Sequence, residues 1–316
     1  MNNEYKCKNA VLICMFNRPE NVLKVFEQVK KVKPPRLYLV CDGIRNQKDI
    51  KKVNECRNIS NLVDWSCKVI NIFSDFNLGC KKRVITGITE AFKSEEKLII
   101  LEDDCIPTIE FFKYMDECLE TYENNDEIAI ISGSNLLDYK FVEQDKIGFS
   151  NYINCWGWGT WKSTWNLFDA FLSIQEVNQT FRTIMKNKNL SFFEKKYWLY
   201  IFRNAIYTRT IWDFYLQYFF FKYNWKSVYP AFNLVHNIGF AYDSTHMKKE
   251  PEYVVKSIPN AIKINLMLKN EMVKYDRKKI NYKREKDIIR TLYGYSFFSY
   301  FKIKVGNILR YVGLRK

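Results

Sequence analysis

Three consecutive carboxylates are the strongest chemical signal in this sequence. Glu102, Asp103 and Asp104 directly follow the apolar run Leu98–Leu101, which has the pattern of a buried strand. Like charges repel at such close range, so this cluster is costly at the carboxyl end of a strand unless a cation compensates it. Oxygen ligands favour Mg²⁺ or Mn²⁺, which commonly bind through one or two carboxylates plus substrate phosphates. The cluster therefore predicts a divalent-cation site, although acids also favour a helix start, and one is expected near Ile109.

Other polar residues follow the remaining strands predicted in the first half. Arg18 precedes Pro19, where a helix is expected to begin, so its guanidinium could reach a phosphate beside free helix N–H groups. Asp42 can accept hydrogen bonds from a base or ribose, and Asn77 and Lys82 accompany the next helix start. Each signal is weak alone, because Asp-Gly is an ordinary turn and a Lys/Arg cluster is usually a solvated face. Together they fall at strand ends on one edge of the predicted sheet.

Aromatic residues and one acid mark the second half of the chain. Trp156 and Trp158 belong to an alternating Trp/Gly segment, in which flat rings can stack on the apolar faces of sugars while glycines admit a ligand close to the backbone. Trp212 and Asp213 begin an aromatic helix, where hydrophobic walls could raise the pKa of the Asp213 carboxyl toward that of a working base. An Asp at a helix start is otherwise an ordinary capping residue.

The elements that must position these residues alternate between strands and helices. Apolar runs predict strands at residues 10–16, 36–42, 67–72, 97–102 and 127–132. A helix is expected over residues 19–30 with Val22, Val25, Phe26 and Val29 on one face, and further helices near Lys48, Gly79 and Ile109. This alternation predicts an α/β fold with a mainly parallel sheet covered by helices, in which ligands bind at the carboxyl ends of the strands.

Charge and composition restrict the class of partner. The net charge of +15 over 316 residues predicts attraction to nucleic acid, an anionic membrane or phosphorylated substrates. The sequence contains no basic recognition helix and no zinc spacing, so no nucleic-acid partner is expected. After Asp287 the chain has no acid and mixes Lys and Arg with Tyr and Phe, a composition that can lie in a membrane interface. We therefore expect a basic C-terminal tail in peripheral contact with an anionic membrane.

Cysteine and histidine usage bears on compartment and on metal binding. Nine cysteines form no CxxC pair and no His/Cys ligand ladder, so reduced thiols in a cytoplasmic protein are expected. The apolar stretch near the N-terminus is too short to predict a signal peptide or a spanning helix, which leaves the inner face of the membrane as the expected surface. Either of the two histidines, His236 or His246, could ligate a metal ion, although a surface or packed histidine is commoner.

In this order, the segments resemble the GT-A family of glycosyltransferases, in particular bacterial sugar transferases related to N-acetylglucosaminyltransferase I. The resemblance covers residues 9–250 and is carried by Asn17-Arg18-Pro19, Asp42-Gly43, Asn77-Leu78-Gly79, Glu102-Asp103-Asp104, the segment from Trp156 to Trp161, Trp212-Asp213, the segment from Asn233 to Gly239, and Thr245-His246. The acidic triplet is moderately specific by itself. Its conjunction with the Trp/Gly segment and the later Asn-Ile-Gly and Thr-His segments is much more specific.

The resemblance implies a role for each matched residue. It places Asp104 on the metal with His246 as a second ligand, and Asp213 as the general base. It places Glu102 and Asp103 on the ribose or sugar of the nucleotide, with Arg18 and Asp42 helping to hold the nucleotide. By the same reading, residues 1–135 form a half that binds the nucleotide sugar, residues 136–250 an acceptor-binding and catalytic half, and residues 251–316 a basic amphipathic extension.

The expected activity is that of a metal-dependent inverting glycosyltransferase, which moves a sugar from a UDP-linked donor to a hydroxyl of a cell-envelope glycan or a lipid-linked acceptor. Two alternatives stay open. A sugar nucleotidyltransferase would share the sheet and the carboxylates, but it should carry a Gly-rich phosphate loop after the first strand, where this chain has Phe16-Asn17-Arg18-Pro19. A non-catalytic carbohydrate-binding or membrane-surface protein would explain the aromatics and the charge but not the acidic triplet.

Overall fold

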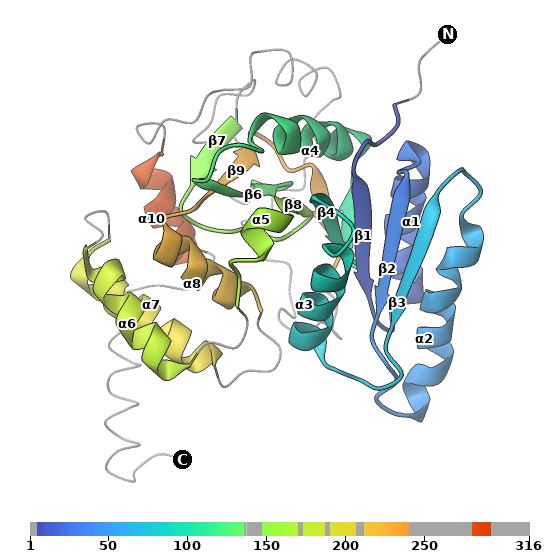
Figure 1. The fold of residues 1–316 in the computed structure, drawn as a ribbon, viewed down its shortest axis with the longest axis horizontal. Coiled ribbons are helices and arrows are strands. Elements are labelled where there is room, and N and C mark those ends of the chain that lie inside the picture. Colours follow the sequence, from blue (N-terminus) through green and yellow to red (C-terminus); the bar gives the residue numbers. More distant parts are fainter. Residues whose placement is uncertain are drawn as a thin grey trace.

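The strand and helix patterns of the first 135 residues fold as βα units around a central sheet (Figure 1). The computed structural model describes residues 5–135, 137, 147–169, 173–186, 190–206, 212–239 and 280–291. The strands in these ranges are β1 (Ala10–Met15), β2 (Arg36–Cys41), β3 (Lys68–Phe73), β4 (Lys97–Glu102), β5 (Cys105–Pro107), β6 (Ile128–Ser132), β7 (Ile147–Ser150), β8 (Trp158–Trp161), β9 (Lys226–Pro230) and β10 (Val235–Asn237).

The α-helices in the same ranges are α1 (Pro19–Val32), α2 (Ile50–Arg57), α3 (Cys80–Ala91), α4 (Ile109–Thr121), α5 (Lys162–Trp165), α6 (Ile174–Lys186), α7 (Phe192–Ala205), α8 (Asp213–Tyr223) and α10 (Tyr282–Thr291), with short 3-10 helices η1 (Gln47–Asp49) and η2 (Asn58–Leu62). The ends predicted for the first half agree with these bounds to within two residues. In α1, Pro19 occupies the first turn, where its missing N–H is not needed, and the apolar face predicted for this helix is buried.

Eight of the strands form one sheet in the order β3-β2-β1-β4-β8-β6-β9-β7. The pairs β1–β2, β1–β4, β2–β3 and β6–β9 are parallel, whereas β4–β8, β6–β8 and β7–β9 are antiparallel. The predicted fold class, an α/β protein with a mainly parallel sheet flanked by helices, is therefore confirmed, and the arrangement is consistent with a Rossmann-like GT-A fold.

Strands β7, β8 and β9 come from the chain after residue 135, so both halves contribute to the same sheet. The Trp/Gly segment, whose glycines suggest turns, forms β8 between β4 and β6. Its four residues are all buried, because helices cover both faces of the sheet at this point. Periodicity alone does not identify such a strand.

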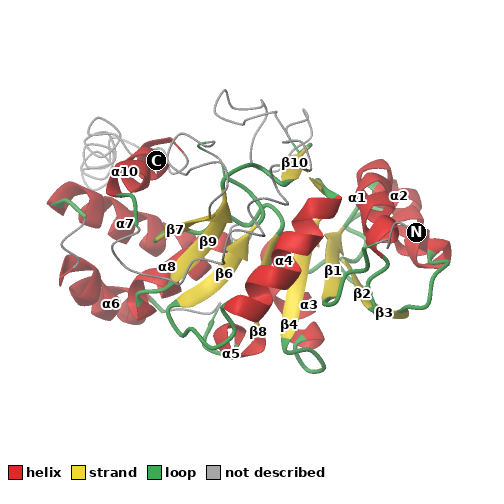
Figure 2. Ribbon diagram, turned by 90° about the horizontal axis from the view of Figure 1, so that it is seen from above, coloured by secondary structure: helices red, strands yellow, loops and turns green. Residues whose placement is uncertain are grey.

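Alternate residues of each strand pack into two apolar layers, one on each face of the sheet. From β1, Val11 and Ile13 belong to the layer that contains the buried faces of α1, α2 and α4, whereas Leu12 belongs to the layer that contains those of α3 and the aromatic helices α6, α7 and α8. Ile288 and Ile289 of α10 join the second layer, so this part of the C-terminal region belongs to the core. Figure 2 shows α1 and α2 at one end of the molecule and α6, α7, α8 and α10 at the other.

Candidate functional site

The acidic triplet lies at the carboxyl end of β4, beside the point where β1 passes into α1. Arg18 is the residue before α1, and its Nη1 atom lies 3.1 Å from Asp103 Oδ1 and 3.1 Å from Asp104 Oδ2. The side chains are only 22%, 13% and 16% exposed, respectively, so these ion pairs are poorly screened by solvent. Since β1 and β4 are parallel neighbours, their carboxyl ends meet at one edge of the sheet and bring Arg18 to the acids.

The charges of this acidic corner, which we define as Glu102, Asp103, Asp104 and Arg18, are unbalanced: one guanidinium faces three carboxyl groups. Burial, followed by the charges of Asp104 and Asp103, raises the pKa of Glu102 well above its usual value. Burial and Asp104 raise the pKa of Asp103 to about 7, although Arg18 and a backbone amide oppose this shift. An additional cation would relieve this repulsion, so the donor set fits a divalent metal ion.

Asp103→Asn removes one of these like charges and keeps an oxygen acceptor for Arg18. In the presence of a chelator we expect the free energy of unfolding at pH 7.5 to rise by about 1–2 kcal/mol. Because the folded pKa of Asp103 lies above the unfolded value, its carboxyl stabilises the fold at low pH and loses this contribution as pH rises through 7. The advantage of the variant should therefore vanish near pH 4. Urea unfolding measures the free energy of unfolding of each variant. The control is Asp126→Asn, which changes an exposed acid and should shift this free energy by less than about 0.5 kcal/mol. A lower free energy of unfolding for Asp103→Asn would contradict the prediction.

Asp213, the first residue of α8, belongs to the same electrostatic environment although it is 109 residues beyond Asp104 in the chain. Its charge contributes to the raised pKa of Glu102, after burial and the neighbouring acids. Burial and then the charges of Glu102 and Asp213 raise the pKa of the Cys80 thiol to about 12, and burial with the same two acids raises that of Cys155. The charge of Asp213 therefore acts on the acidic corner and on the start of α3.

Asp42 holds the loop that leads into α3. Its carboxylate accepts hydrogen bonds from the backbone amides of Gly43 at 2.9 Å, Leu78 at 2.8 Å and Gly79 at 2.9 Å. Asn77 closes the same loop by donating from Nδ2 to the Gly43 carbonyl at 2.8 Å. Both residues thus lie at the predicted sheet edge, where they order the backbone around the α3 N-terminus, a role not predicted from the sequence. The predicted contact of Asp42 and Asn77 with a nucleotide stays a prediction.

The segment from Asn233 to Gly239 reaches the acidic corner through the small antiparallel pair β5–β10. The Ile238 amide donates to the Asp104 carbonyl at 2.8 Å, and the Gly239 amide donates to Asn237 Oδ1 at 2.7 Å. A Cβ atom on Gly239 would lie 2.2 Å from Asp104 Oδ2. The glycine is therefore needed for the close approach of this loop to the Asp104 carboxylate.

Gly239→Ala should displace the Asp104 carboxylate, because that contact is shorter than any van der Waals separation. We expect the concentration of Mn²⁺ that gives half-maximal activity to rise by roughly tenfold or more. Gly87→Ala is the matched control, since its Cβ would lie 2.4 Å from Val40 Cγ1 in the core, away from the acids. It should lower the melting temperature without changing the Mn²⁺ requirement. An unchanged requirement in Gly239→Ala would contradict the argument.

The three tryptophans predicted on the acceptor side differ in exposure. Trp158 and Trp212 stack on each other with ring centroids 5.7 Å apart, and they are only 1% and 5% exposed. Burial leaves no face of these rings open to a sugar, so they serve packing and not stacking on an acceptor. Trp156 is half-buried against the core and is the remaining aromatic candidate.

The other predicted ligands are exposed to solvent or lie outside the described residues. Lys82 is exposed on α3, whereas its neighbour Lys81 packs with Nζ 3.5 Å from the ring centroid of Tyr215 in α8. His236 is exposed in β10, and His246 lies outside the described residues. Within the ranges that the structure describes, no group of three or more His, Cys, Asp or Glu side chains is arranged to hold a metal ion. The predicted role of Asp104 as a metal ligand therefore stays a prediction.

Two connections at the site were not predicted from the sequence. The Lys81–Tyr215 contact joins the first turns of α3 and α8, and thereby the two halves. Asn17 donates to Asp49 at 2.7 Å, and Asp49 also accepts from Arg45 at 2.9 Å, which anchors the turn after β1 to η1. The spacing of residues in the sequence does not predict either connection, because each joins side chains from different helices or from an irregular loop.

No protein-family model and no curated protein matches the chain. Among solved structures, the inositol-1-phosphate CTP transferase from T. maritima is similar with 12% identity over 85% of this chain and 100% of that one, at a TM-score of 0.40. Mouse xyloside xylosyltransferase 1 has 8% identity over 68% and 81% of the respective chains, at a TM-score of 0.35. The 4-diphosphocytidyl-2C-methyl-D-erythritol synthase from Anaerococcus prevotii has 8% identity over 62% and 84%, at a TM-score of 0.27. These similarities are too low to indicate an activity, so the function is inferred from the site.

Proposed function

We propose that this protein is a metal-dependent inverting glycosyltransferase that uses a nucleotide diphosphate sugar, with UDP as the proposed nucleotide. The observation that carries the proposal is the gathering of Arg18 with the three acids at the carboxyl edge of the sheet, where the charge of Asp213 also acts. Binding and catalytic groups at this edge are typical of α/β sheets. A purely structural cluster of like charges in a partly buried position would be costly without such a purpose.

The donor is proposed to bind across the ends of β1 and β4. Arg18 would contact the diphosphate, while Glu102 and Asp103 would accept hydrogen bonds from the ribose or the sugar. Asp104 would hold Mn²⁺ or Mg²⁺, with His246 as the second proposed ligand. When bound, such an ion neutralises the charge that develops on the diphosphate leaving group. The excess of carboxyl groups over guanidinium at the corner supports this assignment.

Asp213 is proposed as the general base. Its carboxylate would remove the proton from the acceptor hydroxyl as that oxygen bonds to the anomeric carbon and the bond from this carbon to the diphosphate oxygen breaks. Attack from the face opposite the leaving group inverts the configuration. Trp156 is the proposed ring for stacking on the acceptor. The Lys81–Tyr215 contact supports this geometry, because it fixes the first turn of α8 against that of α3.

The acceptor is proposed to be a cell-envelope glycan or a lipid-linked sugar, met at the inner face of the membrane by a cytoplasmic enzyme. The acid-free basic sequence after Asp287 and the net charge of +15 support contact with anionic lipid. Because this basic charge is not accompanied by a recognition helix, a nucleic-acid partner is not proposed.

A panel of nucleotide sugars tests the proposal directly. Slow hydrolysis of one nucleotide sugar is expected when Mn²⁺ is present and acceptor is absent, and the corresponding nucleoside diphosphate with Mn²⁺ should raise the melting temperature. Formation of pyrophosphate from a nucleoside triphosphate and a sugar phosphate would instead identify a nucleotidyltransferase. Stabilisation by glycan alone, without turnover of any donor, would identify a carbohydrate-binding protein.

A further inference from the structure

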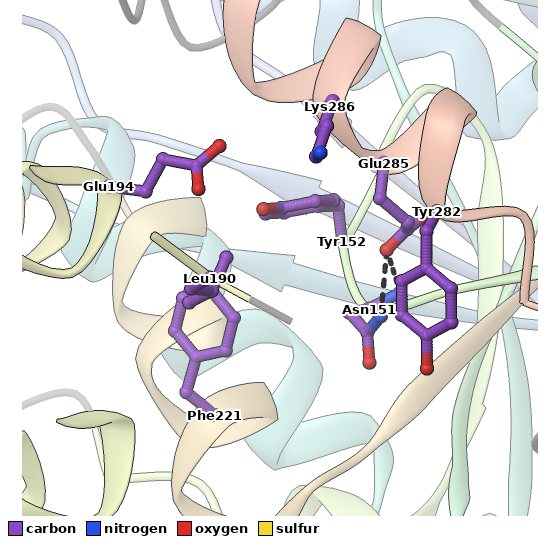
Figure 3. Close-up of a pocket in the computed structure, with 8 residues that line it drawn as sticks. All are labelled: Asn151, Tyr152, Leu190, Glu194, Phe221, Tyr282, Glu285 and Lys286. Carbon is purple, nitrogen blue, oxygen red and sulfur yellow. Dashed lines mark hydrogen bonds between the residues drawn. The ribbon is translucent and has the colours of Figure 1, made fainter. Parts of the chain in front are cut away.

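An aromatic and basic surface lies at the end of the molecule formed by the starts of α7 and α10. We call it the α7–α10 face and define it by Phe192, Phe193, Lys195, Lys196, Tyr282, Lys283 and Lys286. Figure 3 shows that the two helix starts meet around one pocket, which is lined from α7 by Glu194, from the preceding turn by Leu190, and from α10 by Tyr282 and Lys286. The starts of the two helices are therefore neighbours around this pocket, although they are about 90 residues apart in the chain.

Three large aromatic side chains of this face are exposed to solvent. Phe192 is 56% exposed, Phe193 is 41% exposed and Tyr282 is 43% exposed. The phenylalanines are not on a frayed end, because Ser191 and Glu194 form a complete capping box that orders the first turn of α7. Two adjacent phenylalanines on an ordered helix start leave apolar area that another surface could bury.

The charges around these rings are predominantly positive. Lys196 Nζ lies 5.5 Å from the ring centroid of Phe192 and 5.1 Å from that of Phe181 in α6, and Lys195 precedes it on α7. Lys283 and Lys286 are exposed on α10. The acids Glu194 and Glu285 are buried and accept hydrogen bonds from Ser191 and from Ser150 with Asn151, which leaves Asp287 as the half-exposed acid of α10.

We propose that the α7–α10 face docks on an anionic lipid bilayer. Phe192 and Phe193 enter the boundary between head groups and acyl chains, and the four lysines bind lipid phosphates. Exposed aromatic rings bordered by lysines match both the apolar depth and the negative charge of such a surface, whereas lysines are depleted at protein–protein interfaces. No helix in the described part of the chain has the length and apolarity needed to cross a bilayer.

The docked orientation would suit a lipid-linked acceptor. Helix α8 has 11 residues and is therefore about 16 Å long, with Asp213 at its first residue and Phe221, which lines the pocket beneath the face, near its other end. Asp213 would thus lie less than one length of α8 from the residue that lines this pocket. The docking itself does not depend on the proposed transfer reaction.

Flotation with lipid vesicles tests this inference on the full-length chain without any substrate. Vesicles of phosphatidylcholine with 30 mol% phosphatidylglycerol are expected to bind the protein, and pure phosphatidylcholine vesicles at least tenfold more weakly. The double variant Phe192→Ser/Phe193→Ser should weaken binding to the anionic vesicles by roughly tenfold or more, and Lys195→Glu/Lys196→Glu should do the same. Leu23→Ser/Leu62→Ser is the matched control, because these side chains are 41% and 45% exposed but lie at the α1–η2 end of the molecule.

The inference stands if both face variants lose binding while the control binds as the unchanged protein does, with equal melting temperatures for all. It is overturned if the unchanged chain does not bind anionic vesicles. It is also overturned if the face variants bind as well as the control, because other parts of the chain would then be responsible for vesicle binding. It is also overturned if sedimentation shows that Phe192→Ser/Phe193→Ser converts a dimer to a monomer without affecting vesicles, since a second copy would then cover the face. Sugar transfer is not measured, so failure of the proposed enzymatic function would not affect this result.

Discussion

Asp213→Asn is expected to lower the turnover number by roughly 10²–10⁴-fold, because an amide cannot accept the proton of the acceptor hydroxyl. The substitution preserves the size of the side chain and the oxygen that accepts from the Phe214 amide at 3.0 Å, so α8 should still begin at the same residue. Donor binding should be nearly unchanged, since the base contacts the acceptor and not the nucleotide. The removal of a negative charge near Glu102 should, if anything, ease the binding of an anionic donor.

Two measurements separate these effects. Steady-state kinetics at saturating donor gives the turnover number, and the rise in melting temperature with nucleoside diphosphate and Mn²⁺ reports donor binding. Asp126→Asn, which changes an exposed acid in the turn before β6, should leave both quantities unchanged. If Asp213→Asn weakened donor binding but kept its turnover per bound donor, Asp213 would be a donor ligand and not the base.

Removal of divalent metal ions by a chelator is expected to abolish transfer, and added Mn²⁺ should restore it. Asp104→Asn should reduce activity at a fixed Mn²⁺ concentration by about 100-fold, because a neutral amide is a much weaker ligand than a carboxylate. The Asp104 carboxylate lies between Arg18 and Gly239, so its position is defined by ion pairing on one side and by close packing on the other. Part of the lost activity should return at high Mn²⁺.

The control for this experiment is Asp64→Asn, whose side chain is 62% exposed and pairs with Lys30 on α1. It should keep the metal requirement of the unchanged protein. Full transfer in the presence of the chelator would remove Asp104 from the metal site. The acidic triplet would then require another explanation, such as an ion pair with Arg18 and protonation of Glu102, without a metal ion.

Much of the first half could be predicted because its signals are local. The spacing of Val22, Val25, Phe26 and Val29 defines the buried face of α1, and the apolar run before Glu102 defines β4. Parallel strands place their carboxyl ends at one edge of the sheet, so the presence of Arg18 and the acids at the same edge was predicted. The adjacency of β1 and β4, which brings Arg18 into contact with Asp103 and Asp104, was not.

The second half was harder to predict because its strands are short and buried on both faces. β8 has four residues and no alternation of apolar and polar positions, and its antiparallel insertion between β4 and β6 depends on partners about 30 and 60 residues away. The burial of Trp158 and Trp212 likewise depends on their mutual stacking. A sequence pattern shows whether a residue is polar or apolar, but it does not show which other residues pack over it in the folded chain.

The sequence alone determined the α/β class, the ends of the first elements and the acids that must share one edge of the sheet, because each follows from hydrophobic periodicity and chain direction within about 15 residues. Only the tertiary structure decided that the charge of Asp213 acts on Glu102, that Gly239 packs against Asp104, and that Asp42 holds a loop by three backbone amides. The physical reason is that these contacts join segments far apart in the chain, whose pairing is selected by the packing of both layers of the core and not by local preference.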